Sequence, residues 1–259
     1  MEFRGAGLAL RQSSFDTTVA RLHLEPATLW ALFEVETAGC GFLRDRRPRI
    51  LYERHVFHRL THGVYDDGDI SARQPGGYGA LGTAQYDRLL RAMQLDEDAA
   101  LQSASWGMGQ ILGRNYHAAG FATVADMVTA MTASEDAQLA AIEAFLVSQH
   151  LDVLLAQQQW AQFAAKYNGR TYKKNHYDVR LWAEYQKASV SPPSVTVRAV
   201  QLYLTYLGFH PGPVDGVVGA LTRSAAAAFR KSADLPETDA VDDALAADLL
   251  ERVAVVGPA

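Results

Sequence analysis

Two acidic side chains, Glu34 and Glu36, lie in an apolar segment of residues 26–37. A helix over this segment, at about 100° per residue, would place Glu36 in the middle of the apolar stripe and Glu34 well off it. A carboxyl group on an apolar face tends to have a raised pKa, because desolvation disfavours its charged form, and a general acid working near neutral pH needs that pKa. The pattern favours Glu36 as the acid. The alternative is a glutamate at a frayed last turn that faces solvent.

Three histidines, His55, His58 and His62, recur at a spacing that puts them on one helical face, with Glu53 nearby. Such a set is a candidate for the zinc site of a peptidase or amidase. The spacing is not His-Glu-x-x-His, however, and no cysteine supports a metal site. We therefore predict solvated or packing histidines and no metal.

The single cysteine, Cys40, rules out an internal disulfide. Its glycine-flanked position is typical of a small buried residue in a tight turn rather than of a nucleophile. The glycines at positions 76, 77, 79 and 82 follow no clear strand and open no recognisable phosphate loop. A nucleotide site is therefore not supported.

The net charge of −5 is spread along the chain: residues 195–259 carry 5 Lys/Arg and 8 Asp/Glu, which gives −3, and the remainder carries −2. Neither part has the basic stripe that nucleic-acid binding normally needs. No stretch approaches the roughly 20 apolar residues of a transmembrane helix, and the N-terminus lacks the pattern of a secretory signal. We expect no nucleic-acid partner and no stable membrane insertion.

Helical patterning dominates the elements that must position these side chains. Pro26 suits a first helical position, and Gly39 and Gly41 end that helix. A strand-like run, Arg49–Tyr52, leads into a helix at residues 53–60, and residues 66–83, rich in Asp, Gly and Pro, should be a loop. Further helices are expected at 84–95, 97–104, 123–131, 134–149, 151–156 and 158–166, with Ser134 as an N-cap.

Adjacent prolines and flanking serines in residues 187–196 predict an extended linker. This linker would separate a domain of residues 1–186 from one of residues 197–259. The second domain has the pattern of three helices with turns between them, and Thr222 is a candidate cap of the middle helix.

Three motifs resemble those of goose-type lysozymes and lytic transglycosylases, in the order that this superfamily shows. They are Glu36-Thr37-Ala38-Gly39, SASWGMGQILG at residues 103–113 and FAAKYNGRTY at residues 163–172. Small residues in the second motif would let backbone amides approach a sugar closely. The resemblance implies that Glu36 is the catalytic acid, ending a buried helix that faces a sugar cleft. It also implies substrate contacts by Ser105, Gln110, Tyr167 and Asn168, with Tyr167 near the acid.

The chain resembles the phage and prophage N-acetylmuramidase endolysins still more closely, over roughly residues 15–185. This resemblance rests on EVETAGCGF at residues 34–42 and PRILYERHVF at residues 48–57. Thr37 stands where these proteins usually have serine, and it keeps the hydroxyl group.

Glycoside hydrolysis usually uses a second carboxylate. Glu53, at the end of the strand-like run, is the first choice for positioning water or stabilising an oxocarbenium-like state, although it could instead cap a helix or pair with Arg54. The loop residues Asp66, Asp67 and Asp69 are the alternatives. Some relatives manage with one glutamate and release an anhydro sugar, so the product stays open.

The C-terminal segment resembles the small helical peptidoglycan-binding domain. The matching residues are Val200-Gln201, Leu204, Leu207-Gly208-Phe209, Val214-Asp215-Gly216, Gly219, Thr222, Ala225 and Phe229. The departures are Phe209 for Tyr and Arg230 for Gln. Most of the distinctive residues are expected to shape the fold, among them Asp215, Gly216, Gly219 and Thr222.

Together the resemblances imply a mainly α-helical protein, with a lysozyme-like catalytic domain that has a minor β element, and a three-helix peptidoglycan-binding domain. The implied function is that of an endolysin, with no cofactor, hydrolysing the β-1,4 bond between N-acetylmuramic acid and N-acetylglucosamine. The alternatives are a lytic transglycosylase, a zinc amidase or a non-catalytic wall-binding phage component. We expect a monomer made in the host cytoplasm without a signal peptide. It would reach its partner, the peptidoglycan of the periplasmic wall, after a holin opens the membrane.

Overall fold

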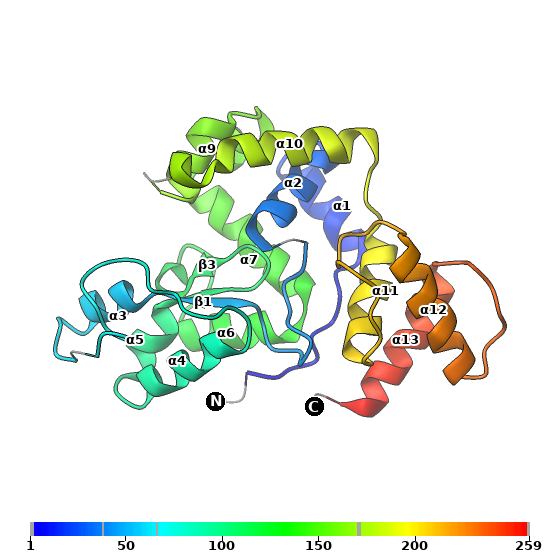
Figure 1. Ribbon diagram of the computed structural model, residues 1–259. Helices are drawn as coiled ribbons and strands as arrows, with labels where there is room; N and C mark the ends of the chain where they lie inside the picture. Colours follow the sequence, from blue (N-terminus) through cyan, green and yellow to red (C-terminus); the bar gives the residue numbers. More distant parts are fainter. Residues whose placement is uncertain (1–2, 38, 66, 170–171, 258–259) are drawn as a thin grey trace.

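The computed structural model describes residues 3–37, 39–65, 67–169 and 172–257. It is mainly helical with one small sheet, as the sequence predicts (Figure 1). The N-terminal part contains α1 (Gln12–Arg21), α2 (Pro26–Thr37), α3 (Arg54–Leu60), α4 (Ala84–Met93), α5 (Glu97–Gln102), α6 (Val124–Ala133), α7 (Glu135–Ser148), α8 (Asp152–Ala156), α9 (Trp160–Tyr167) and α10 (Tyr177–Val190). None of the described helices is long and apolar enough to cross a membrane.

Helix α2 runs through the interior of this part, and α10 lies along it (Figure 1). It begins at Pro26 as predicted, where the missing N–H would be unpaired in any case. Beyond its end Gly39 has a φ of +82°, and the Gly39 N–H closes the last turn by donating to the Phe33 carbonyl oxygen at 3.2 Å. Most side chains of α2 are buried, on all sides of the helix.

The sheet is antiparallel, with the order β1 (Ile50–Tyr52), β2 (Ala104–Trp106) and β3 (Ile111–Leu112). Only β1 follows from the sequence pattern. The helix expected at 97–104 ends at Gln102, because the chain turns there to pair Trp106 with Ile50 across 56 positions. Ser105 pairs with Leu51 on one side and Leu112 on the other, so the second motif forms a β-hairpin.

Two helices, α1 and α10, lie in stretches where the sequence analysis named none. The N-cap at Ser134 is confirmed, since the Ser134 hydroxyl accepts a hydrogen bond of 3.1 Å from Ala137 N–H. Residues 67–83 form a loop without helix or strand. The connection to the C-terminal module is shorter than expected: α10 continues to Val190, and only residues 191–194 lie outside helices.

The C-terminal module consists of α11 (Val195–Tyr206), α12 (Ala220–Ser232) and α13 (Asp243–Val256). Thr222 does not cap α12, which begins two residues earlier; its buried hydroxyl instead donates to the Pro211 carbonyl oxygen at 2.9 Å. Gln201 organises the loop before α12, because its amide oxygen accepts from the Asp215 and Gly216 N–H groups and its amide nitrogen donates to Asp215 Oδ1. Asp215, Gly216 and Thr222 therefore shape the module, as predicted.

Apolar side chains form two cores. The larger core fills the N-terminal part and includes most of α2, the sheet and α7. The smaller core lies among α11, α12 and α13, but it also takes in Ala9, Cys40 and Phe42 from the N-terminal part. The two parts are thus packed together through shared apolar contacts rather than joined only by the chain.

Candidate active site

A cavity of about 520 Å³ opens between the sheet, the end of α2 and the pair α9–α10. Residues from eight separate stretches of the sequence line it. Among them are all six residues that the sequence analysis selected: Glu36, Glu53, Ser105, Gln110, Tyr167 and Asn168. The three motifs therefore meet at one site.

Glu36 lies in the last turn of α2 and reaches the cavity from its apolar interior side. Burial raises the pKa of Glu36 from 4.5 to about 7, while the hydrogen bond from Asn168 and the nearby Arg180 partly oppose this shift. Asn168 Nδ2 donates to Glu36 Oε1 at 2.9 Å. A carboxyl group with this pKa is protonated in a large share of molecules near neutral pH and can donate a proton.

Glu34 is more buried than its place off the apolar stripe of the helix predicts. Because α2 is surrounded by protein on all sides, Glu34 is also half-buried, and burial followed by repulsion from Glu184 raises its pKa to about 7. The expected contrast in burial between Glu34 and Glu36 is therefore wrong. Position separates them instead: Glu34 lines a different hollow, beside Trp30, Lys187 and Asp215.

Glu53 occupies the N-cap position of α3, but its side chain makes no capping hydrogen bond. Glu53 Oε2 lies 3.2 Å from His55 Nδ1, and Arg54 turns away to donate to the Gly68 carbonyl oxygen. Burial raises the pKa of Glu53, and the neighbouring Tyr78 hydroxyl lowers it in part. Glu53 is thus a second, partly desolvated carboxyl group on the same cavity as Glu36.

The alternative loop carboxylates lie elsewhere. Asp67 and Asp69 both form ion pairs with Arg91, at 2.7 and 2.6 Å, and neither lines the cavity. Asp66 lies outside the described residues.

Gln110 is held in a left-handed conformation, with φ of +46°. Its amide nitrogen donates to the carbonyl oxygens of Gly107 and Arg49, at 2.9 and 3.2 Å. The amide nitrogen is therefore occupied, and the amide oxygen is the group that remains for a sugar hydroxyl or N-acetyl N–H. Ser105 reaches the same cavity from β2, between Leu51 and Leu112.

Tyr167 and Asn168 lie at the end of α9, close to Glu36. The Tyr167 hydroxyl donates to the Gly109 carbonyl oxygen at 2.6 Å, and its ring stacks on Phe163 with centroids 5.1 Å apart. Burial and the nearby charge of Glu36 raise the pKa of Tyr167. Asn168 Oδ1 is buried and has no hydrogen-bond partner among the described residues, whereas Asn168 Nδ2 bonds Glu36.

Several residues of the cavity escaped the sequence analysis: Tyr78, Asn115, Phe145, Lys166, Asn175 and Tyr177. Tyr177, the first residue of α10, is the most informative of them. Its pKa is raised by burial and then by the charges of both Glu36 and Glu53, so it lies near the two carboxyl groups at once. Its only signal in the sequence is its position shortly after the third motif.

The competing sites take ordinary structural roles. Cys40 is buried as predicted, burial raises the pKa of its thiol to about 11, and Sγ donates to the Phe42 carbonyl oxygen at 3.2 Å. His55 approaches Glu53, whereas His58 Nδ1 lies 3.3 Å from Ser71 Oγ. Among the described residues, no three His, Cys, Asp or Glu side chains are arranged to hold a metal ion.

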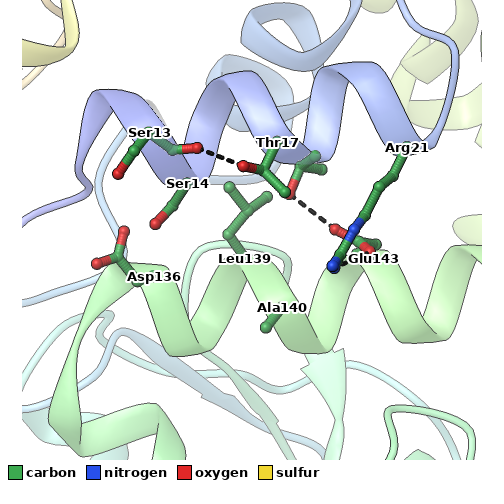
Figure 2. Close-up of a pocket in the computed structure, with 9 residues that line it drawn as sticks. Ser13, Ser14, Thr17, Arg21, Asp136, Leu139, Ala140 and Glu143 are labelled. Atoms are coloured by element: carbon green, nitrogen blue, oxygen red, sulfur yellow. Dashed lines mark hydrogen bonds and ion pairs between the residues drawn. The ribbon is translucent and has the colours of Figure 1, made fainter.

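A further hollow, of about 230 Å³, lies between α1 and α7 (Figure 2). Its two carboxylates are engaged in ion pairs, Asp136 with Arg11 at 2.6 Å and Glu143 with Arg21 at 3.2 Å. Thr18 also donates to Glu143. These two carboxylates are therefore held in ion pairs with arginines, unlike Glu36 and Glu53, whose pKa values are raised by burial.

Comparison with known proteins agrees with this geometry. Residues 25–189 match the family model of N-acetylmuramidase. The chain belongs to the N-acetylmuramidase family. This muramidase is therefore a glycoside hydrolase of lysozyme type that acts on peptidoglycan. Residues 194–249 match the peptidoglycan binding domain, which identifies α11–α13 as the wall-binding module.

Among solved structures, the muramidase resembles the crystal structure of the Burkholderia AP3 phage endolysin. The two share 36% sequence identity and a TM-score of 0.64, over 71% of this chain and 72% of the other. No curated protein matches the chain.

Proposed function

We propose that this muramidase is an endolysin whose general acid is Glu36. The observation that carries the proposal is the desolvated Glu36 carboxyl group, with its pKa raised to about 7, on a cavity lined by polar and aromatic side chains. A protonated Glu36 would donate its proton to the glycosidic oxygen between N-acetylmuramic acid and N-acetylglucosamine as that β-1,4 bond breaks.

Substrate contacts are assigned to the other side chains of the cavity. The unpartnered Asn168 Oδ1 is placed to accept a hydrogen bond from a sugar N–H or hydroxyl group, since a buried amide oxygen without a partner is costly. The Gln110 amide oxygen and the Ser105 hydroxyl would bind from the sheet side, and the Tyr167 ring would close the cleft.

Glu53 is the proposed second carboxyl group, and it would position water or stabilise positive charge on the sugar. Its location on the cavity supports this role, as does the absence of a capping bond. With water as acceptor the products carry reducing ends. A lytic transglycosylase acting on the same bond would leave anhydro ends instead.

The biological setting is part of the proposal. The endolysin would be a monomer made in the host cytoplasm, and a holin would give it access to the periplasmic peptidoglycan. The similarity to a phage endolysin supports this setting. We also propose a catalytic domain within residues 1–186 and a wall-binding domain within residues 197–259. Of the linker expected at residues 187–196, only residues 191–194 lie outside α10 and α11.

The test compares Glu36→Gln with Glu34→Gln on outer-membrane-permeabilised cells and on purified peptidoglycan. Both glutamates have a pKa raised to about 7 on the same helix, so Glu34→Gln is a matched control. We expect Glu36→Gln to lose roughly 10³-fold or more of the rate of turbidity loss, since a general acid contributes factors of about 10² to 10⁴. Glu34→Gln should keep wild-type activity. Equal activity of Glu36→Gln and wild type would refute the assignment, and mass spectrometry of the products separates reducing from anhydro ends.

A further inference from the structure

Arg198 lies in the first turn of α11, in the wall-binding module, yet its side chain is fully buried in the catalytic part. Its guanidinium group forms a bidentate ion pair with Glu135, the first residue of α7, with Nη2 and Oε1 2.6 Å apart. Its Nε donates to the Gly39 carbonyl oxygen, and Nη2 lies 3.4 Å from the Met108 sulfur. One side chain of the module thus contacts three separate segments of the catalytic part.

Glu135 extends this network further. Its carboxylate oxygens also accept hydrogen bonds from the backbone N–H groups of Leu10, at 3.1 Å, and Gly41, at 3.0 Å. Both carboxylate oxygens of Glu135 and all three nitrogens of Arg198 therefore have hydrogen-bond partners. A buried pair of charges is tolerated under this condition. The network fixes the chain on both sides of Cys40.

The segments held by Arg198 are those that place the catalytic acid. Gly39 follows Glu36 by three residues and closes the last turn of α2. Met108 lies in the second motif, its carbonyl oxygen accepts a bond of 3.3 Å from the Thr37 hydroxyl, and the next residue, Gly109, accepts from Tyr167. Arg198 therefore connects the end of α2 to the second motif, which supplies Ser105 and Gln110 to the cavity.

We propose that Arg198 is a positioning residue for Glu36, so that the wall-binding module completes the active site as well as tethering the enzyme to its polymer. This inference rests on the proposed function of Glu36. Without Arg198 the Gly39 carbonyl oxygen loses its hydrogen-bond donor, and the turn after α2 is held less firmly. The Glu36 carboxyl group then shifts relative to the sugar. Small misplacements of reacting groups are costly to the rate, by about 10²-fold for 1 Å.

The test uses the full chain and soluble, uncross-linked glycan fragments, for which tethering to a polymer has no effect. Arg198→Lys keeps a positive charge beside Glu135 but lacks the planar fork that binds both Glu135 oxygens while Nε donates separately to Gly39. We expect kcat to fall by about 10- to 100-fold with KM changed by less than about threefold, because chemistry rather than substrate binding is affected. The basic limb of the pH profile should move to lower pH, as water reaches Glu36 and its pKa falls towards the ordinary value.

Tyr206→Phe is the matched control. Its hydroxyl donates to the Gly7 carbonyl oxygen at 2.9 Å and so also links the module to the catalytic part, but away from Glu36. It should leave kcat and the pH profile unchanged. If Arg198→Lys does not fold, the double variant Arg198→Met with Glu135→Gln removes the charges together and leaves neither buried alone; the same loss of kcat is expected.

The outcomes are distinct. A loss of kcat with a shifted basic limb in the Arg198 variants, and neither change in Tyr206→Phe, supports the inference. Wild-type kcat and pH profile in the Arg198 variants overturn it while leaving Glu36 as the acid. The inference is also overturned if kcat falls in proportion to Tm in all variants, Tyr206→Phe included. Full activity of Glu36→Gln, measured alongside, overturns the proposed function and the inference together.

Discussion

Asn168 donates a hydrogen bond of 2.9 Å from its amide nitrogen to Glu36 Oε1, joining residues 132 positions apart in sequence. The bond comes from the residue that ends α9 and reaches the last turn of α2. It has two effects on the acid: it orients the carboxyl group, and it lowers the pKa of Glu36 against the larger effect of burial. If Glu36 is the general acid, as proposed, the balance of these effects sets the pH range of the enzyme.

The first prediction concerns that balance. A general acid must be protonated, so the activity of the wild type should fall as pH rises through the pKa of Glu36, about 7. Asn168→Ala removes a bond that favours the charged form, and we expect the basic limb of kcat/KM to move to higher pH while the maximal rate drops. The measurement is kcat/KM from pH 4 to 9 on soluble glycan fragments. A basic limb that stays in place or moves to lower pH contradicts this account.

The second prediction concerns Glu53. If Glu53 acts in its charged form, activity must also fall when pH drops below its pKa, which burial raises. Glu53→Gln should therefore lose about 10²-fold or more in rate, in the range of acid–base groups, and flatten the acidic limb while keeping the basic limb of Glu36. An unchanged acidic limb in an active Glu53→Gln protein would assign that limb to another group.

The third prediction concerns Glu34 and stability. Its folded pKa is about 7 and its ordinary value 4.5, so between these values the folded protein binds more protons than the unfolded chain, and stability falls as pH rises through this window. Glu34→Gln cannot ionise. It should be more stable than wild type at pH 8 by about 1–2 kcal/mol, since one pKa unit is worth about 1.4 kcal/mol and partial exposure reduces the effect.

Urea unfolding at pH 8 and pH 4 measures the difference. At pH 4 the carboxyl group is mostly protonated in both the folded and the unfolded protein, so most of the advantage of Glu34→Gln should vanish. A stabilisation that is equal at both values would point to a cause other than ionisation.

The fourth prediction separates structure from chemistry at Tyr167. Tyr167→Phe keeps the ring against Phe163 but leaves the buried Gly109 carbonyl oxygen without its donor, which costs about 1–3 kcal/mol. We expect a lower Tm with a rate reduced less than about tenfold, far less than for Glu36→Gln. A loss as large as that of Glu36→Gln, in a protein of normal Tm, would give the hydroxyl a direct part in the reaction.

Local patterns in the sequence predicted much of the site. Proline at a helix start and glycines at its end determine α2 through short-range effects, so the bounds of that helix and the place of Glu36 follow from a few neighbouring residues. The cavity also confirms that the three motifs converge, since Gln110, Tyr167 and Asn168 line it with Glu36.

Features that depend on distant contacts were missed. The strands β2 and β3 are too short to show a period of their own, and they form because Trp106 pairs with Ile50. Glu34 looks exposed on a helical wheel, but it is covered from outside the helix, by α10 and the loop of Asp215. Arg198 carries no local signal at all, since its partner Glu135 lies in the other part of the protein.

The shared smaller core bears on how such enzymes can be recombined. Ala9, Cys40 and Phe42 pack among side chains of α11–α13, such as Leu202 and Phe229. A chimera that exchanges the chain after residue 194 for an unrelated targeting module would expose these three apolar side chains to water. A stable chimera therefore requires a new module with an apolar face that covers these three side chains. Joining an unrelated module within residues 191–194 would otherwise destabilise the catalytic part.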